Sequence, residues 1–97
     1  MTVQRTSANH KTTYELHDGS GLSGVLTYTA APDGPAIWKI LMPGPEGTED
    51  LFGTRQFPDP DAAQLQSWLS EVIGAPGAAE LAAGVDAEPP PASAWRS

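Results

Sequence analysis

Residues 59–74 read DPDAAQLQSWLSEVIG, and this stretch decides the fold because it predicts an amphipathic helix. Asp59 is placed to cap the helix, since its carboxylate can accept hydrogen bonds from the free amides of the first turn. Pro60 would then occupy the first helical position, where its missing N–H costs nothing. Apolar side chains recur three and four residues apart and form one stripe, which comprises Leu65, Trp68, Leu69, Val72 and Ile73. Gly74 and Pro76 predict the end of the helix.

The predicted helix must pack against another part of the chain. A helix of about four turns is only marginally stable by itself in water. Residues 60–74 contain no basic side chain, which argues against a helix that lies on a membrane surface. We therefore expect the apolar stripe to belong to the core rather than to a partner-binding face.

Four strands are predicted ahead of the helix, because apolar and polar side chains alternate there. They span residues 12–17, 23–30, 36–42 and 49–57. Turns rich in glycine and proline separate them. The third strand, AIWKILM, is apolar on nearly both faces, which is typical of a central strand. In the fourth, Gly53 is a candidate bulge that could switch the alternation, so the pattern leaves open which face is buried.

Short connections favour pairing between consecutive strands, so we expect an α+β fold. It consists of a four-stranded antiparallel β-meander packed on one C-terminal α-helix (ββββα), over residues 12–74. Residues 1–11 are predicted to form a flexible N-terminal tail. The Ala/Gly/Pro-rich residues 75–97 are predicted to form a largely disordered C-terminal tail, in which only 78–83 has the composition of a short helical turn. That tail is either a passive end or a tether that binds through Trp95.

Composition excludes several classes of protein. Ninety-seven residues limit the chain to one small domain. The absence of cysteine excludes disulfides, thiol catalysis and cysteine-ligated zinc. A net charge of −7 opposes nonspecific binding to nucleic acid. The N-terminal stretch has no apolar run, so we expect no signal peptide, no membrane span and a cytoplasmic location. Abundant Ala, Gly and Pro with few lysines are typical of a GC-rich bacterial or phage genome.

The titratable residues form no recognisable catalytic or metal-binding pattern. His17 precedes Asp18 and shares a strand face with Glu15, but two or three such groups do not make a metal site. The glycines of residues 18–24, DGSGLSG, lie between two strands and not before a helix, so they do not predict a phosphate loop. We therefore expect no enzyme activity, no catalytic residue, no metal site and no cofactor.

The sheet face that the helix leaves uncovered is the candidate partner-binding surface, and it carries Val25, Ile37, Lys39 and Leu41. Large apolar side chains on an open face indicate an interface with another protein or with a second copy of the chain. We therefore expect a small acidic, non-catalytic regulatory or accessory protein that acts by binding another protein, and the same face suits a homodimer.

Two alternatives remain. The first is a single-stranded nucleic-acid-binding module in which Tyr28 and Trp38 stack on bases, although the negative charge makes a nucleic-acid partner the weaker expectation. The second is an inhibitor that blocks a basic, nucleic-acid-binding partner by acidic mimicry.

Overall fold

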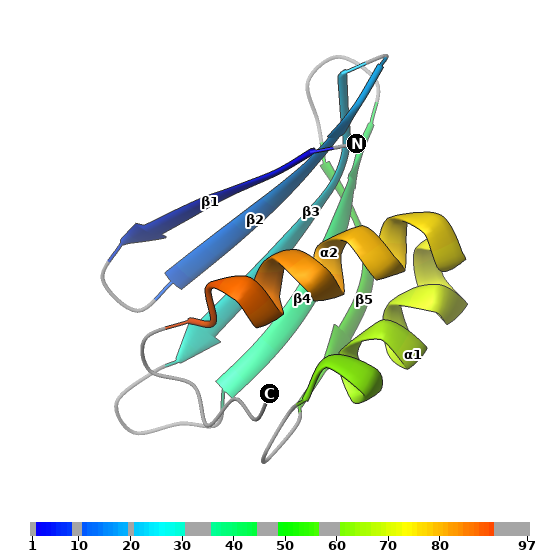
Figure 1. Ribbon diagram of the computed structural model, residues 1–97. Coiled ribbons are helices and arrows are strands. Elements are labelled where there is room, and N and C mark those ends of the chain that lie inside the picture. The colour runs from blue at the N-terminus through cyan, green and yellow to red at the C-terminus, as the bar shows by residue number, and fades with distance from the viewer. Residues whose placement is uncertain are drawn as a thin grey trace.

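A computed structural model describes residues 2–8, 11–19, 21–30, 36–44, 49–56 and 61–90. Over these ranges the chain forms a five-stranded antiparallel sheet followed by two helices (Figure 1). The strands are β1 (Thr2–Ala8), β2 (Lys11–Asp18), β3 (Gly21–Ala30), β4 (Ala36–Pro43) and β5 (Glu49–Arg55), and the helices are α1 (Ala62–Ile73) and α2 (Ala75–Ala87). The strands lie in the sheet in their sequence order, so the sheet is a meander.

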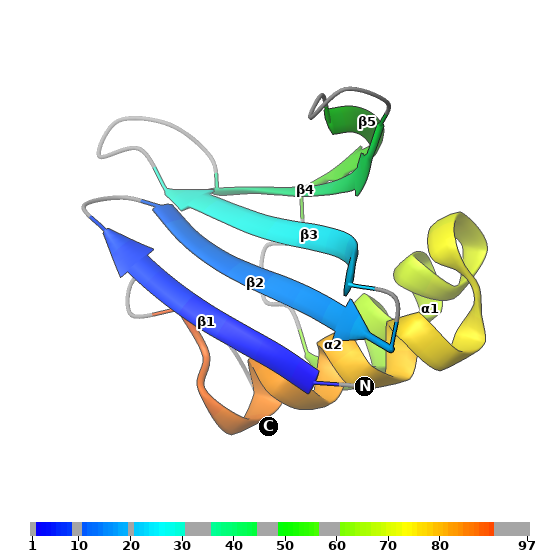
Figure 2. The same cartoon turned by 90° about the horizontal axis from the view of Figure 1, so that it is seen from above.

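Both helices cover the same side of the sheet, so the molecule has two layers (Figures 1 and 2). α2 lies over β1 and β2, and it approaches β1 closely where Gly84 meets Val3. α1 lies over the other end of the sheet, where Trp68 and Val72 sit directly above Gly53 of β5. The helices also pack against each other, which completes the layer. Neither is long and apolar enough to cross a membrane, as far as the described ranges go.

The core lies between the two layers. On the sheet side it is built from alternate residues of the three inner strands, namely Tyr14 and Leu16, Leu26 and Tyr28, and Trp38 and Ile40. On the helix side it is built from Leu65, Trp68 and Leu69 of α1 and from Ala78, Leu81, Ala82 and Val85 of α2. The rings of Tyr28 and Trp38 meet edge to face, with their centroids 4.8 Å apart, which is a favoured aromatic geometry.

The α+β class and the antiparallel sheet are confirmed, but the expected numbers of strands and helices are wrong. β1 lies within residues 1–11, because it pairs with β2 along its whole length and Val3 packs against the core. α2 occupies residues 75–87, because one side of it supplies buried side chains. The ββββα order is therefore corrected to βββββαα.

The ends of the helices differ in part from the prediction. The cap of α1 is Asp61 and not Asp59, since the Gln64 amide donates to Asp61 Oδ1 at 2.8 Å. Gly74 ends α1 as predicted, with a positive φ of 92° that suits glycine. Helical structure continues past Pro76, because this proline lies in the first turn of α2, where no backbone N–H is needed.

The bulge expected at Gly53 is confirmed by the strand register. Ile40 pairs with Gly53 but Leu41 pairs with Leu51, so one extra residue of β5 is inserted there. Three residues considered above lie outside the described ranges, namely Asp59, Pro60 and Trp95.

Candidate functional site: the open face of the sheet

The sheet face turned away from the helices carries the side chains that alternate with the core positions. We call this surface the open face. Strand register arranges it in rows across the sheet. Its positions on β1 are Thr2, Gln4, Thr6 and Ala8, and those on β2 to β5 include Lys11, Thr13, Glu15, His17, Val25, Thr27, Thr29, Ile37, Lys39, Leu41, Leu51 and Thr54. The row that contains Glu15, Val25, Leu41 and Leu51 crosses four neighbouring strands, so apolar side chains of β3, β4 and β5 lie side by side.

The four residues predicted as partner-binding share this face. Lys39 is exposed, and Ile37 and Leu41 are half-buried. Val25 is only 6 % exposed, so it forms the floor of the surface and not its rim. The sequence pattern missed Leu51, which is 57 % exposed and is the one exposed large hydrophobic side chain in the described residues. The bulge beside Gly53 could have revealed it, because the extra residue shifts the alternation of β5 and places Leu51 opposite Leu41 on the open face.

Charge is distributed unevenly between the two layers. The open face carries both lysines of the chain, Lys11 and Lys39, and, among the side chains that the structure describes on β2 to β4, the carboxylate of Glu15. Residues 61–90, which form the helix layer, contain no basic residue and five carboxylates, namely Asp61, Glu71, Glu80, Asp86 and Glu88. The open face is therefore the less acidic side of an acidic molecule.

His17 lies at the end of the open face near Glu15. Its Nε2 is 3.7 Å from Glu15 Oε1, which is too long for a hydrogen bond. This nitrogen is buried and makes no hydrogen bond. Over the described ranges, no group of three or more His, Asp or Glu side chains could hold a metal ion.

Tyr28 and Trp38, the residues of the stacking alternative, lie beneath the helices. Tyr28 is 4 % exposed and Trp38 is fully buried. Burial also raises the pKa of Tyr28 above its ordinary value. Stacking on a base requires an exposed ring face. Neither ring has an exposed face in this structure.

A hollow of about 560 Å³ opens between the end of β5 and α1. Its lining is mostly polar and comprises Arg55, Gln56, Ala63, Gln64, Ser67, Trp68 and Glu71. Small-molecule sites are usually enclosed and largely apolar, with a few convergent polar groups. This open, polar hollow does not have that form.

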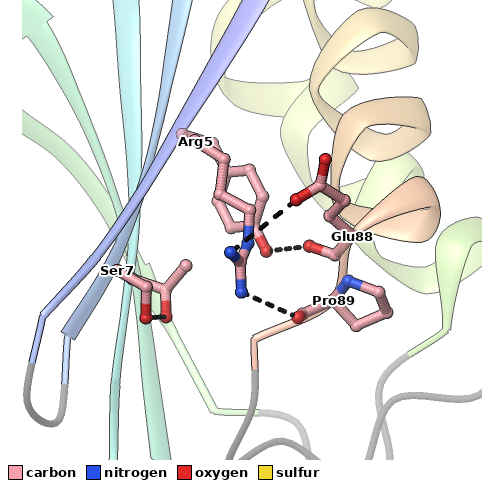
Figure 3. A network of polar contacts seen from close by, with 6 residues as sticks. Arg5, Ser7, Glu88 and Pro89 are labelled. Atoms are coloured by element: carbon pink, nitrogen blue, oxygen red, sulfur yellow. Dashed lines mark hydrogen bonds and ion pairs between the residues drawn. The ribbon is translucent and has the colours of Figure 1, made fainter.

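A polar cluster joins the end of α2 to β1 and β2. We call it the clasp, and it consists of Arg5, Tyr14, Glu88 and Pro89 (Figure 3). The Tyr14 hydroxyl donates to the Glu88 carbonyl at 2.6 Å, and Arg5 Nη2 donates to the Pro89 carbonyl at 3.2 Å. Arg5 Nη1 lies 3.7 Å from Glu88 Oε2. All of these contacts lie within the chain, so the clasp is structural.

Comparison with protein-family models, with curated proteins and with solved structures gives no match for this chain. Function is therefore inferred from two properties of the molecule, the apolar row on the open face and the separation of charge between the layers.

Proposed function

We propose that this protein is a small acidic, non-catalytic regulatory or accessory protein that acts by binding another protein through the open face. One observation carries the proposal: an apolar row of Val25, Leu41 and Leu51 crosses a sheet face that neither α1 nor α2 covers. The absence of cysteine suits the cytoplasm, where we place the protein.

The composition of the open face supports this role. Its apolar row is bordered by the next row, in which Lys39 and Thr54 are exposed and Thr27 is buried. An apolar centre with a polar rim is the usual anatomy of a protein–protein interface. Complete burial of a leucine contributes about 1.5–3 kcal/mol, so covering Leu51 alone would strengthen binding measurably.

The test compares two variants that add the same negative charge at different places. Leu51→Asp places the charge on the apolar row, and Gln66→Asp places it on an exposed position of α1. Each protein is immobilised and exposed to an extract of the organism's own cells, after circular dichroism has verified its fold. We expect proteins that are retained by the wild type and by Gln66→Asp to be lost from Leu51→Asp. Equal retention by all three proteins would remove the open face as the binding surface.

A second candidate function is acidic mimicry, which the charge of the helix layer favours. Glu71, Glu80 and Asp86 are exposed on that layer, and no basic side chain lies between residues 61 and 90. A basic partner would be attracted to it in a salt-dependent manner. The triple variant Glu71→Gln, Glu80→Gln, Asp86→Asn should then lose the captured protein while Leu51→Asp keeps it, which is the reverse of the first outcome.

A further inference from the structure

Glu15 and Lys39 lie on the open face on opposite sides of the central strand β3. Register pairs Glu15 with Val25 and Lys39 with Thr27, which are successive open-face positions of β3. Lys39 is exposed, and the Glu15 side chain is 39 % exposed. The two opposite charges therefore flank β3, one row apart.

This placement makes the open face complementary to itself. In a two-fold symmetric dimer, each contact between two different residues is made twice. In this dimer, two sheets face each other, and the two-fold axis lies between them and crosses β3 obliquely. Glu15 of each copy then lies opposite Lys39 of the other, and Val25 lies near the centre of the contact. Because a desolvated lysine is costly unless it is paired, this pairing is what allows Lys39 to enter an interface.

The size of the open face is sufficient for such a contact. Five strands of seven to ten residues present roughly 500 Å² on one face, at the usual rise per residue and strand spacing. Two copies would thus bury at most about 1,000 Å², which is the minimum for a specific interface and lies below the usual range. An interface of this size predicts a dimer that depends on protein concentration.

The charge of the helix layer also favours contact through the open face. Contact through the helices would oppose the carboxylates of one copy to those of the other. Packing sheet against sheet, with the sheets about 10 Å apart, instead places both acidic layers on the outside of the dimer. The carboxylates are then as far apart as the molecule permits.

We infer that the occupant of the open face is a second copy of this chain, held by reciprocal Glu15–Lys39 pairs around the apolar row. The inference rests on the proposed function, because it narrows the protein that the open face binds to a second copy of this chain. The dimer is a four-layer molecule with two sheets inside and the helices outside.

Sedimentation equilibrium of the full chain between about 1 μM and 1 mM tests the dimer, since micromolar to millimolar dissociation constants fall in that range. Glu15→Lys and Lys39→Glu each oppose like charges, and each should weaken dimerisation about tenfold or more. The double variant Glu15→Lys, Lys39→Glu restores opposite charges and should return the dissociation constant to within about threefold of the wild type. Gln66→Asp is the matched control and should leave the dissociation constant unchanged.

The outcomes separate the dimer from the proposed function. A wild type that stays monomeric up to about 1 mM overturns the dimer. A dimer that the single variants leave intact, or that the double variant does not rescue, overturns the Glu15–Lys39 pairing. A third outcome is that the wild type is monomeric but captures extract proteins that Leu51→Asp does not capture. The proposed function then stands, and only the second copy is removed as the partner. Extract proteins retained by Leu51→Asp remove the proposed function itself.

Discussion

The hydroxyl of Tyr14 lies 2.6 Å from the main-chain carbonyl of Glu88 and donates a hydrogen bond to it, joining β2 to the residue that follows α2. The Arg5 guanidinium reaches the same turn from β1 and holds the Pro89 carbonyl and the Glu88 carboxylate (Figure 3). α2 contributes four buried residues to the core, and only two of them, Leu81 and Val85, have large side chains. The clasp therefore supplies much of what fixes the end of this helix.

Tyr14→Phe should lower the free energy of unfolding by about 1–2 kcal/mol, because it leaves a part-buried carbonyl without its donor. Urea denaturation measures the change. Ser70→Ala is the control, since it removes a 2.7 Å hydrogen bond to Gln66 that is exposed and that water can replace. It should cost less than about 0.5 kcal/mol. Equal losses in the two variants would contradict a special role for the clasp.

Stability should fall at alkaline pH. Burial raises the pKa of Tyr14 above its ordinary value of 10.0, although the Arg5 guanidinium opposes the rise, and burial raises the pKa of Tyr28 as well. Above that value the unfolded chain loses these protons while the folded chain keeps them. Their stabilising contribution is thus complete below pH 10 and is lost as the pH rises through the folded-state pKa values.

Urea denaturation at several values between about pH 8 and pH 11 checks this dependence. The free energy of unfolding should decline with a shallower slope in Tyr14→Phe than in the wild type. Identical slopes would show that ionisation of Tyr14 is not linked to unfolding.

Gly84 marks the closest approach of α2 to β1. A Cβ at this position would lie 2.8 Å from Cγ1 of Val3, so Gly84→Ala forces the helix and the strand apart. The cost of about 1–3 kcal/mol should exceed the gain in helix propensity. Val3→Ala removes the 2.8 Å contact and leaves only the Cβ of residue 3, at 3.2 Å, so in this background Gly84→Ala should cost at least about 1 kcal/mol less than in the wild type. A double-mutant cycle measures this coupling, and additive effects would contradict the contact.

Asp61 caps α1 through the Gln64 amide. Asp61→Ala should cost about 1 kcal/mol, because the amide loses its acceptor. Asp61→Asn keeps a side-chain oxygen that can accept the same hydrogen bond and should retain most of the stability. Thermal unfolding of the two variants distinguishes them, and equal losses would indicate that the negative charge matters more than the cap.

The parts of the fold that are predictable from sequence are those in which large apolar residues follow a strict period. In β3 and β4, Leu26 and Tyr28 alternate as do Trp38 and Ile40, so the pleat alone assigns them to the core face. The stripe of α1 is equally regular, and Leu65 and Leu69 are fully buried.

The two missed elements depend on weaker or more distant signals. In α2 the buried residues Ala78, Leu81, Ala82 and Val85 do follow helical spacing, but small side chains make that stripe inconspicuous and Pro76 resembles a stop. In β1, Val3 is the one large apolar residue. Arg5 is accommodated by partners more than eighty positions away, which no local pattern can indicate.

The candidate site was predictable to the same degree. Alternation in β3 and β4 assigns Val25, Ile37, Lys39 and Leu41 to one face without any knowledge of the helices. Leu51 was not assigned to a face, because the bulge shifts the alternation of β5 by one residue. The alternation of β5 alone therefore could not show which of its two faces is buried.

The meander order has a consequence for biosynthesis. All five strands precede both helices in the sequence, so a ribosome releases the complete sheet before the elements that cover it. At ordinary elongation rates, the segment from Arg55 to Val85 takes about 2–6 s to appear. During that interval the indole of Trp38 has no helix above it, and the nascent chain exposes its most aggregation-prone surface. Translational pausing between β5 and α2 should therefore lower the yield of native protein.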